Sequence, residues 1–408
     1  MRYRTIRGVH DGLPGDVARW RCVEQAARTL FSRYCFQEVR LPVLEQAALF
    51  TRSVGEATDI VAKEMYRFTD RGGEEICLRP EGTAGAVRAF LQAGLGRSGE
   101  QRWFYIGPMF RRERPQKGRL RQFQQIGVEW FGPAGPIADI ELLTMAWGLI
   151  ETLGIDGARL ELNSLGCPSC RPCYRETLVG WLRARRDALC ATCRTRVDTN
   201  PMRVLDCKEP DCRQALRDAP VMVEHLCDAC DDHFRAVTAG LAVPYAINPH
   251  IVRGLDYYSR TAFEIVTDRL GAQGTVIAGG RYDHLVAELG GAPTPAIGFA
   301  LGLERIALLL DPIEVERAQV AVVALGEEAR IPSIRAAERL RAAGISTIHC
   351  GGGSGKRQFR MADRERVAAA LILGTDELAR GLWSVRDMRD GSQQTLTPEE
   401  AIARLRDS

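Results

Sequence analysis

The spacing of hydrophobic residues changes several times along the 408-residue chain, and each change predicts a different kind of element. Between Asp16 and Phe36 the apolar residues recur at helical intervals and form one stripe: Trp20, Val23, Ala27, Leu30 and Phe31. The segments Trp103–Glu113 and Arg121–Phe131 instead alternate like β-strands, and a basic loop joins them. We therefore expect a long helix, followed later by an antiparallel hairpin.

The middle of the chain differs in character from its flanks. Leu160–Leu165 has the pattern of a strand, whereas Cys167–Leu241 is rich in cysteine and in helical spacing. Strand character returns at Pro249–Ile265 and at Gly274–Ile277, and Gly298–Leu310 has the pattern of a helix that opens on glycine. A helical insertion between two parts of one sheet accounts for this order.

The last part of the chain alternates between strand and helix patterns. "VAVVAL", "IRAAERLRAAGI", "STIHC" and "AALILG" follow one another after residue 316, which predicts a compact α/β module. We place domain boundaries near residues 166, 244 and 316. These boundaries separate the segments 1–166, 167–243, 244–316 and 317–408.

Composition and charge restrict the class of protein. The chain is 45% hydrophobic and 26% charged, and its net charge is +3, so a polyanion would meet local basic patches and not a uniformly basic surface. No apolar run reaches membrane-spanning length, and the first residues lack the apolar centre of a signal peptide. We expect a cytoplasmic protein with no membrane contact.

The expected hairpin has one polar and one apolar face, because side chains alternate along a strand. The apolar face of the return strand carries Ile126, Val128 and Trp130. The polar face combines six residues from the two strands: Gly107, Arg111, Glu113, Gln125, Gly127 and Glu129. Glycines there leave room for a ligand to approach the backbone. A solvated face with charge pairs is the alternative, and the hairpin alone does not decide between them.

Nine of the 13 cysteines lie between Cys167 and Cys230, mostly in pairs at intervals typical of tetrahedral zinc. One plausible four-thiolate set for a structural Zn²⁺ is Cys190, Cys193, Cys227 and Cys230. Cys207 and Cys212 can form a second set with two of Cys167, Cys170 and Cys173. Reduced thiols without metal are the alternative, and the odd number in an apparently cytosolic chain argues against a disulfide framework.

Six segments resemble a known family in sequence and in order. "MFRRERPQKGRLRQFQQIGVEWFG" resembles motif 2 of class II aminoacyl-tRNA synthetases, in its histidyl-tRNA synthetase form. "LPVLE" resembles motif 1, the dimer-forming segment, and "AIGFALGLERI" resembles motif 3. "LRPEGTA" is similar to the amino-acid-binding loop, and "VRGLDYYSRTAFE" and "AGGRYDHL" are similar to the two histidine-specific signatures.

The resemblance implies an α+β fold. It consists of a class II antiparallel-sheet catalytic domain (1–166 and 244–316), a helical, cysteine-rich insertion (167–243) and a C-terminal α/β anticodon-binding domain (317–408). It implies a homodimer that forms histidyl-adenylate from L-histidine and ATP, with Mg²⁺, and transfers the histidyl group to tRNA(His). Arg111 and Arg253 are the implied catalytic residues at the α-phosphate, where both also contact histidine. Glu113 would bind adenine, and Arg305 the far end of the triphosphate.

The family also implies a histidine pocket and a tRNA contact. Glu81, Gly82, Thr83 and Gln125 would hold the ammonium group, and Glu129, Tyr257, Tyr258 and Tyr282 would surround the imidazole. Arg114 and Gln116 would meet the acceptor end of tRNA. Ordinary half-buried tyrosines and a simple Glu81–Arg79 ion pair are the alternatives for individual residues.

Two other functions are consistent with parts of the pattern. The regulatory subunit of ATP phosphoribosyltransferase shares the fold without the charging activity, but it typically lacks the C-terminal domain and the signature arginines. This chain retains Arg111, Arg253 and Arg305 together with a C-terminal module, which favours the enzyme. An RNA-binding module without catalysis is the third hypothesis, which predicts tRNA binding without histidine activation.

Overall fold

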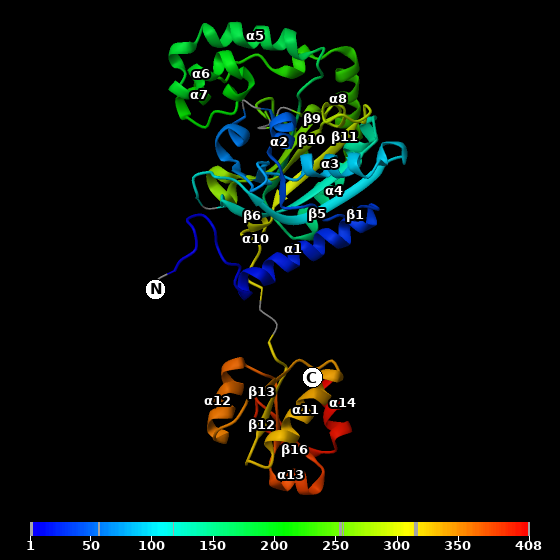
Figure 1. Ribbon diagram of the computed structural model, residues 1–408, viewed down its shortest axis with the longest axis vertical. Helices are drawn as coiled ribbons and strands as arrows, with labels where there is room; N and C mark the ends of the chain where they lie inside the picture. Colours follow the sequence, from blue (N-terminus) through cyan, green and yellow to red (C-terminus); the bar gives the residue numbers. More distant parts are fainter. Residues whose placement is uncertain are drawn as a thin grey trace. The chain divides into compact units, whose positions relative to one another are not determined.

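The computed structural model describes residues 3–55, 58–116, 118–252, 255, 257–313 and 317–406. The chain forms two compact units, Met1–Ile313 and Glu314–Ser408, which Figure 1 colours from blue to yellow and from yellow to red. Within the described ranges, no helix has both the length and the apolar character needed to cross a membrane.

An eight-stranded sheet forms the centre of the first unit, in the order β1-β5-β6-β11-β10-β9-β7-β8. Only the edge pairs β1–β5 and β7–β8 are parallel, and the other pairs are antiparallel. The bounds are Gln37–Glu38 (β1), Gln101–Phe110 (β5), Gln122–Phe131 (β6), Ala158–Ser164 (β7), Tyr245–Ile247 (β8), Ser259–Thr267 (β9), Thr275–Arg281 (β10) and Ala296–Gly302 (β11). The predicted hairpin and antiparallel sheet are confirmed.

Two long helices cover one face of this sheet. The predicted first helix is α1 (Pro14–Arg33), and its stripe packs against the sheet through Phe31, whose ring lies 5.4 Å from that of Phe104. α4 (Pro136–Thr152) lies beside α1, and the short helix α10 (Leu303–Ala307) follows β11 and packs against α1. The segment η6 (Asp268–Gln273) connects β9 to β10. As the alternation predicts, Ile126, Val128 and Trp130 all belong to this core.

A smaller layer covers the opposite face, so that α1 and α2 lie on opposite sides of the sheet (Figure 1). It contains a three-stranded sheet in the order β2-β4-β3, with bounds Leu44–Gln46, Glu75–Leu78 and Tyr66–Thr69. Its helices are α2 (Ala47–Val54), η1 (Ile60–Glu64), α3 (Thr83–Gln92), η2 (Leu95–Arg97) and α9 (Leu285–Glu288). The odd-numbered side chains Trp103, Tyr105 and Phe131 pack here.

Two predicted elements were wrong in part. The helix expected at 298–310 begins only at Leu303 and forms α10, whereas residues up to Gly302 belong to strand β11, because that segment pairs with β6 and β10 on both sides. The described residues of 249–258 form no strand, although a strand was expected there. The side chain of Asn163 fixes this segment instead, donating to the carbonyls of Pro249 and Ile251 at 3.2 and 2.9 Å.

The insertion is helical, as its pattern predicts, and α5, α6 and α7 lie together away from the sheet (Figure 1). Its elements are α5 (Arg171–Arg183), η3 (Arg186–Ala188), α6 (Ala191–Thr199), η4 (Pro201–Val204), α7 (Pro210–Ala215), η5 (Met222–His225) and α8 (Asp228–Gly240). They share a small core that includes Leu178, Leu182 and Val197. Phe234 and Val237 of α8 return to the main core.

The second unit is an α/β module with a five-stranded sheet in the order β13-β12-β14-β15-β16. Its strands are Val320–Ala324 (β12), Thr347–His349 (β13), Ala369–Leu373 (β14), Trp383–Asp387 (β15) and Gln393–Leu396 (β16). Its helices are Arg330–Ala342 (α11), Gly355–Glu365 (α12), Thr375–Arg380 (α13) and Pro398–Arg406 (α14). The central strands β12 and β14 are buried throughout, as expected for strands covered on both faces.

A buried charge network connects α4, α8 and β10. The fully buried Arg281 donates from Nη1 to Asp139 Oδ2 at 2.5 Å, and His233 Nε2 lies 3.1 Å from the other oxygen of Asp139. Arg281 Nε also lies 3.1 Å from Asp283. The network fixes the end of β10 immediately before Tyr282.

We expect Asp139→Ala to destabilise the first unit by about 3–5 kcal/mol, because the substitution leaves the Arg281 guanidinium buried without its main partner. Denaturant unfolding of the full chain measures the loss. Asp268→Ala is the matched control, because Asp268 pairs with Arg159 at an exposed position. An Asp139→Ala midpoint equal to that of Asp268→Ala would contradict a structural role for the network.

Candidate active site

A cleft of about 700 Å³ opens on the face of the sheet opposite α1 and α4. Its walls come from β5, β6, β9, β10 and β11 and from the segments around residues 60, 81, 206 and 257. Nine residues proposed from the sequence line it: Glu81, Thr83, Arg111, Glu113, Gln116, Gln125, Tyr257, Tyr258 and Tyr282. Arg305 lines it as well. Arg253 lies outside the described residues.

The buried carboxylate of Glu129 lies behind the inner end of the cleft, bonded to residues that line it, but does not itself line the cleft. It accepts hydrogen bonds from Thr83 Oγ1 at 2.7 Å, from the Tyr105 hydroxyl at 3.0 Å and from the Tyr282 hydroxyl. Burial raises the pKa of Glu129 to about 8, although these hydroxyls oppose the shift. A carboxylate held by three hydroxyls in a buried place is suited to bind a partner with N–H groups.

Three tyrosines form an aromatic wall beside Glu129. The rings of Tyr257 and Tyr258 lie 4.7 Å apart, and that of Tyr282 lies 5.8 Å from Tyr257. All three are buried, and burial raises the pKa of Tyr257 and Tyr282 well above the ordinary value. The phenol of Tyr257 therefore remains protonated at neutral pH and can donate a hydrogen bond to a flat polar ligand, whereas that of Tyr282 already donates to Glu129.

Glu81 and Gln125 are two further buried residues that line the cleft. The Glu81 carboxylate accepts from the backbone N–H groups of Thr83 and Ala84 at 2.6 and 2.9 Å, and burial raises its pKa. Arg79 donates to backbone carbonyls, including that of Pro108 at 2.9 Å, so a simple Glu81–Arg79 pair does not describe either residue. Among the described residues, the buried Oε1 of Gln125 has no hydrogen-bond partner.

The glycines expected on the polar face of the hairpin make room for protein side chains and not for a ligand, which corrects the expectation from sequence. A Cβ at Gly127, or at Gly82 in the loop before α3, would collide with the ring of Tyr105. A Cβ at Gly107 would collide with the guanidinium of Arg79. Sequence analysis did not identify Tyr105 and Arg79 as part of this site. A signal existed for Tyr105, because it lies on the same face of its strand as Gly107 and Arg111.

The outer end of the cleft is cationic. Arg111 donates from Nε to the Pro80 carbonyl at 2.9 Å and lies over the ring of Phe123, with its Cζ 5.3 Å from the ring centre. Arg305 donates to the carbonyls of Gly118 and Thr275 at 2.7 and 2.9 Å. Burial lowers the pKa of Arg305, and the charges of Arg119 and Arg111 lower it further. The guanidinium groups therefore repel one another across a site that suits an anion.

Glu113 lies between these cations. Its Oε2 is 3.0 Å from Arg119 Nε, and burial raises the pKa of Glu113 despite the opposing charge of Arg119. The remaining predicted residues of this loop, Arg114 and Gln116, are exposed at its tip. Only Gln116 reaches the cleft.

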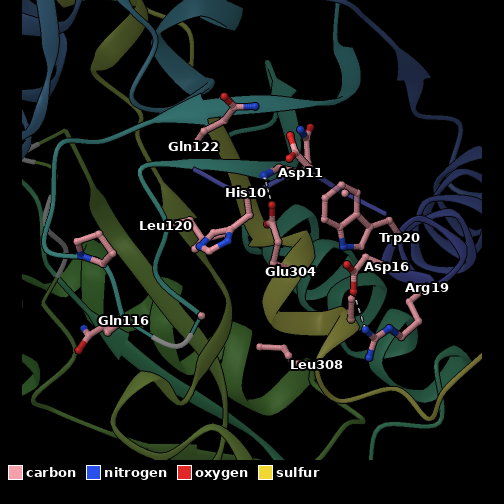
Figure 2. A pocket seen from close by; sticks show the side chains of 15 residues that line it. His10, Asp11, Asp16, Arg19, Trp20, Gln116, Leu120, Gln122, Glu304 and Leu308 are labelled. Carbon is pink, nitrogen blue, oxygen red and sulfur yellow. Dashed lines mark hydrogen bonds and ion pairs between the residues drawn. The ribbon is translucent and has the colours of Figure 1, made fainter. Parts of the chain in front are cut away.

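A second cavity of about 700 Å³ lies on the other side of the same loop (Figure 2). His10, Asp11, Asp16 and Trp20 form one wall, and Glu304 contributes from α10. Glu304 accepts from the backbone N–H of Gln124 at 2.8 Å, and burial raises its pKa to about 7. Sequence analysis missed this cavity, because its wall comes from N-terminal residues far from the loop in sequence.

The two cavities share four lining residues: Gln116, Gly118, Leu120 and Glu304. The basic loop between β5 and β6 therefore separates the two cavities. Its position depends on contacts from both sides, including the hydrogen bond from Arg305 to Gly118.

The structure corrects the predicted set of four thiolates. Cys190 and Cys193 lie with Cys207 and Cys212, whereas Cys227 and Cys230 lie with Cys167 and Cys170. The predicted set of Cys190, Cys193, Cys227 and Cys230 is therefore split between two clusters. The reason is the path of the chain. The insertion leaves the sheet after β7 and returns to it through α8, so the cysteines at these two ends meet, whereas those near α6 and α7 form their own cluster.

Comparisons with known proteins agree with the motifs. A family model described as "Histidyl-tRNA synthetase" matches residues 8–168 and 204–306, and an "Anticodon binding domain" model matches 319–408. Histidine–tRNA ligases of Trichlorobacter lovleyi and Geobacter sulfurreducens are each 48% identical to this chain, with 98% of it covered. The alignments cover 97% and 99% of those relatives.

Solved structures resemble the whole chain. Apo histidyl-tRNA synthetase of S. aureus aligns with a TM-score of 0.82 and 31% identity, covering 99% of both chains. A Bacillus halodurans C protein titled ATP phosphoribosyltransferase regulatory subunit/histidyl-tRNA synthetase aligns at 0.63 with 18% identity, covering 92% of this chain and 97% of its own. With a family model that matches most of the chain and relatives at 48% identity over nearly its full length, this chain belongs to the histidyl-tRNA synthetase family.

Proposed function

We propose that this protein is a histidine–tRNA ligase that forms histidyl-adenylate in the cleft and then transfers the histidyl group to tRNA(His). One observation carries the proposal: a single cleft has three tyrosines at its inner end, one of them bonded to the buried carboxylate of Glu129 behind it, and two arginines at its outer end. The inner end suits an imidazole, and the outer end suits phosphates. This arrangement brings the two substrates of an adenylation reaction together.

The first step joins the histidine carboxylate to the α-phosphorus of ATP. A carboxylate oxygen forms the new bond, and the bond from that phosphorus to the departing pyrophosphate breaks. No general base is needed, because the nucleophile is already an anion. The difficulty is charge repulsion, so positioned cations supply the main catalytic effect. We assign this role to Arg111, and to Arg253 from the family pattern.

Selection of histidine depends on hydrogen bonds to the ring. Glu129 can accept from an imidazole N–H, and the Tyr257 and Tyr258 hydroxyls can meet the second nitrogen. A side chain without these groups leaves buried polar atoms unpaired, which is costly. We assign the ammonium to Glu81, Thr83 and the unpartnered Gln125 Oε1, with the backbone at Gly82 shaping the loop.

Nucleotide binding occupies the outer end of the cleft. We place the α-phosphate at Arg111, the far end of the triphosphate at Arg305 and the adenine near Glu113. ATP normally arrives with Mg²⁺, which takes carboxylate, phosphate and water oxygens. Glu264 lines the cleft and would be a suitable carboxylate ligand. When bound, the ion neutralises charge on the phosphates.

We propose that tRNA and a second copy of the chain complete the enzyme. The exposed Arg114 and Gln116 are placed to meet the acceptor end, and α12 of the C-terminal unit presents the exposed Lys356 and Arg357 to RNA. A homodimer is supported by the half-exposed Leu44 of β2, in the segment that resembles motif 1.

The regulatory-subunit alternative is less well supported. The Bacillus halodurans C structure shows that the fold is shared, but at 18% identity it says nothing of activity. The chain also matches an anticodon-binding model at 319–408, which a protein that does not bind tRNA would not need.

Histidine-dependent exchange of labelled pyrophosphate into ATP tests the proposal. We expect exchange with L-histidine and at least about 10³-fold less with other amino acids, since these lack the ring nitrogens that Glu129 and the tyrosine hydroxyls would bind. Charging of tRNA(His) with labelled histidine tests the second step. Tight tRNA binding without any exchange would contradict the proposal and favour a module without catalysis.

A further inference from the structure

Eight cysteines of the insertion form two separate clusters. The base cluster contains Cys167, Cys170, Cys227 and Cys230, and the outer cluster contains Cys190, Cys193, Cys207 and Cys212. In each cluster the four sulfur atoms lie within 4.8 Å of one another. Each cluster combines two pairs that are distant in the sequence, and each has two buried and two partly buried members.

The distances between sulfur atoms identify the kind of centre. Sulfurs lie 3.4 Å apart for Cys167 and Cys170, 3.8 Å for Cys167 and Cys227, and 4.0 Å for Cys190 and Cys207. Four thiolates placed tetrahedrally about 2.3 Å from zinc lie about 3.8 Å from one another. A disulfide requires about 2.05 Å. A four-iron cluster spreads its thiolates farther, because each binds a different iron.

Backbone hydrogen bonds also prepare both clusters for thiolates. The N–H of Cys227 donates to Cys170 Sγ at 3.2 Å, and the N–H of Cys190 donates to Cys212 Sγ at 3.0 Å. In both clusters the donor begins a helix, α8 or α6, and the acceptor comes from the other pair. Such bonds stabilise a charged sulfur more than a neutral thiol.

We propose that the insertion binds two Zn²⁺ ions as structural metals, one in the base cluster and one in the outer cluster. Each ion is held by four thiolates and has no open position for a substrate or water. Each therefore fastens chain segments together and takes no part in the reaction.

The base cluster fastens the insertion to the wall of the histidine pocket. Cys167 and Cys170 follow β7, and Cys227 and Cys230 open the helix that returns to the main core. Arg171, next to this cluster, donates to the carbonyls of Leu165 and Tyr258, the first at 3.1 Å. The metal thus supports the backbone of the aromatic wall.

The outer cluster holds a segment that reaches the opposite wall of the cleft. Between Cys193 and Cys207, Arg196 and Arg203 lie 2.8 and 3.8 Å from Asp59. Asp59 and Arg203 both line the cleft. Loss of either metal is therefore expected to raise the KM for histidine or ATP, and this consequence alone rests on the proposed function.

Metal analysis of the full chain, purified without chelators, tests the proposal. We expect two zinc ions per chain. Cys227→Ser and Cys207→Ser should each lower the count to one, because each removes a partly exposed ligand of one cluster. Cys173→Ser should keep two, because Cys173 is exposed in the same region but belongs to neither cluster. One zinc ion or none in the unaltered chain overturns the proposal.

Titration with Co²⁺ gives a second test that does not depend on the variants folding. Metal-stripped full-length protein should develop the visible absorption of tetrahedral cobalt thiolate and saturate at two equivalents. Saturation at one equivalent, or no such absorption, contradicts two four-thiolate sites. Neither test uses substrate, so a zinc count of two without pyrophosphate exchange would refute the proposed function and leave this proposal standing.

Discussion

Arg111→Ala is expected to lower kcat/KM for histidine-dependent pyrophosphate exchange by about 10²–10³-fold, equivalent to about 3–4 kcal/mol of transition-state stabilisation. In the described part of the chain, the Arg111 side chain makes one hydrogen bond, from Nε to the Pro80 carbonyl, so both Nη groups are available for phosphate oxygens. Negative charge increases on the α-phosphate during the reaction. A planar pair of donors at this place stabilises the transition state more than the bound substrates.

Steady-state exchange kinetics measure this effect, with Arg112→Ala as the matched control. Arg112 is the next residue of the same loop, is exposed and does not line the cleft. The control should retain exchange and thus separates a specific contact from a general loss of positive charge. If Arg111→Ala and Arg112→Ala had equal activity, Arg111 would have no place at the reacting phosphate.

Glu129→Gln is expected to lower kcat/KM for histidine by about 10²-fold and at the same time to stabilise the protein in alkaline solution. An imidazole N–H beside Glu129 favours its ionised form, and the amide cannot supply this charge-assisted hydrogen bond, which contributes about 1.5–3 kcal/mol. The stability change follows from linkage. Burial raises the pKa of Glu129 from 4.5 to about 8, so the folded state binds this proton more tightly than the unfolded state.

The sign of the pH dependence follows from that difference. The carboxyl group favours folding fully below about pH 4.5, and this contribution is lost as the pH rises through about 8. Glutamine does not titrate, so the variant should match the unaltered protein near pH 4 and exceed its stability above pH 8. Denaturant midpoints across this range measure the effect.

Glu100→Gln is the control for both parts of the Glu129 prediction. Glu100 accepts a hydrogen bond from the Trp130 indole at 3.0 Å but does not line the cleft. It should change neither the exchange kinetics nor the alkaline stability. A Glu129→Gln protein with normal histidine kinetics would refute the proposed pocket, whatever its stability.

The hydrophobic pattern correctly predicted the elements that depend on residues close in the sequence, such as the first helix and the hairpin. The stripe at Val23, Ala27 and Phe31 forms the buried side of α1, and the alternation along 122–131 gives the two faces of β6. The helix expected at 298–310 was wrong in its first five residues, because these belong to β11, which is defined by neighbours far away in the sequence. A short apolar run bounded by glycine fits either a strand or a helix, and the partners decide.

The site was predictable where the family motifs name its residues. The packing beneath it was not, because Tyr105 and Arg79 occupy spaces that glycines on other elements leave open. The cysteines show the same limit. Their spacing identifies four pairs, but which pairs meet depends on where β7 and α8 place the two ends of the insertion.

A crystal structure with ATP and histidinol, which lacks the reacting carboxylate, is the most direct test of the shared cleft. It should show the imidazole against Glu129, the α-phosphate within hydrogen-bond distance of Arg111 and the outer phosphates at Arg305. ATP bound elsewhere, such as in the cavity beside His10 and Trp20, with either arginine turned away from it, would contradict the account.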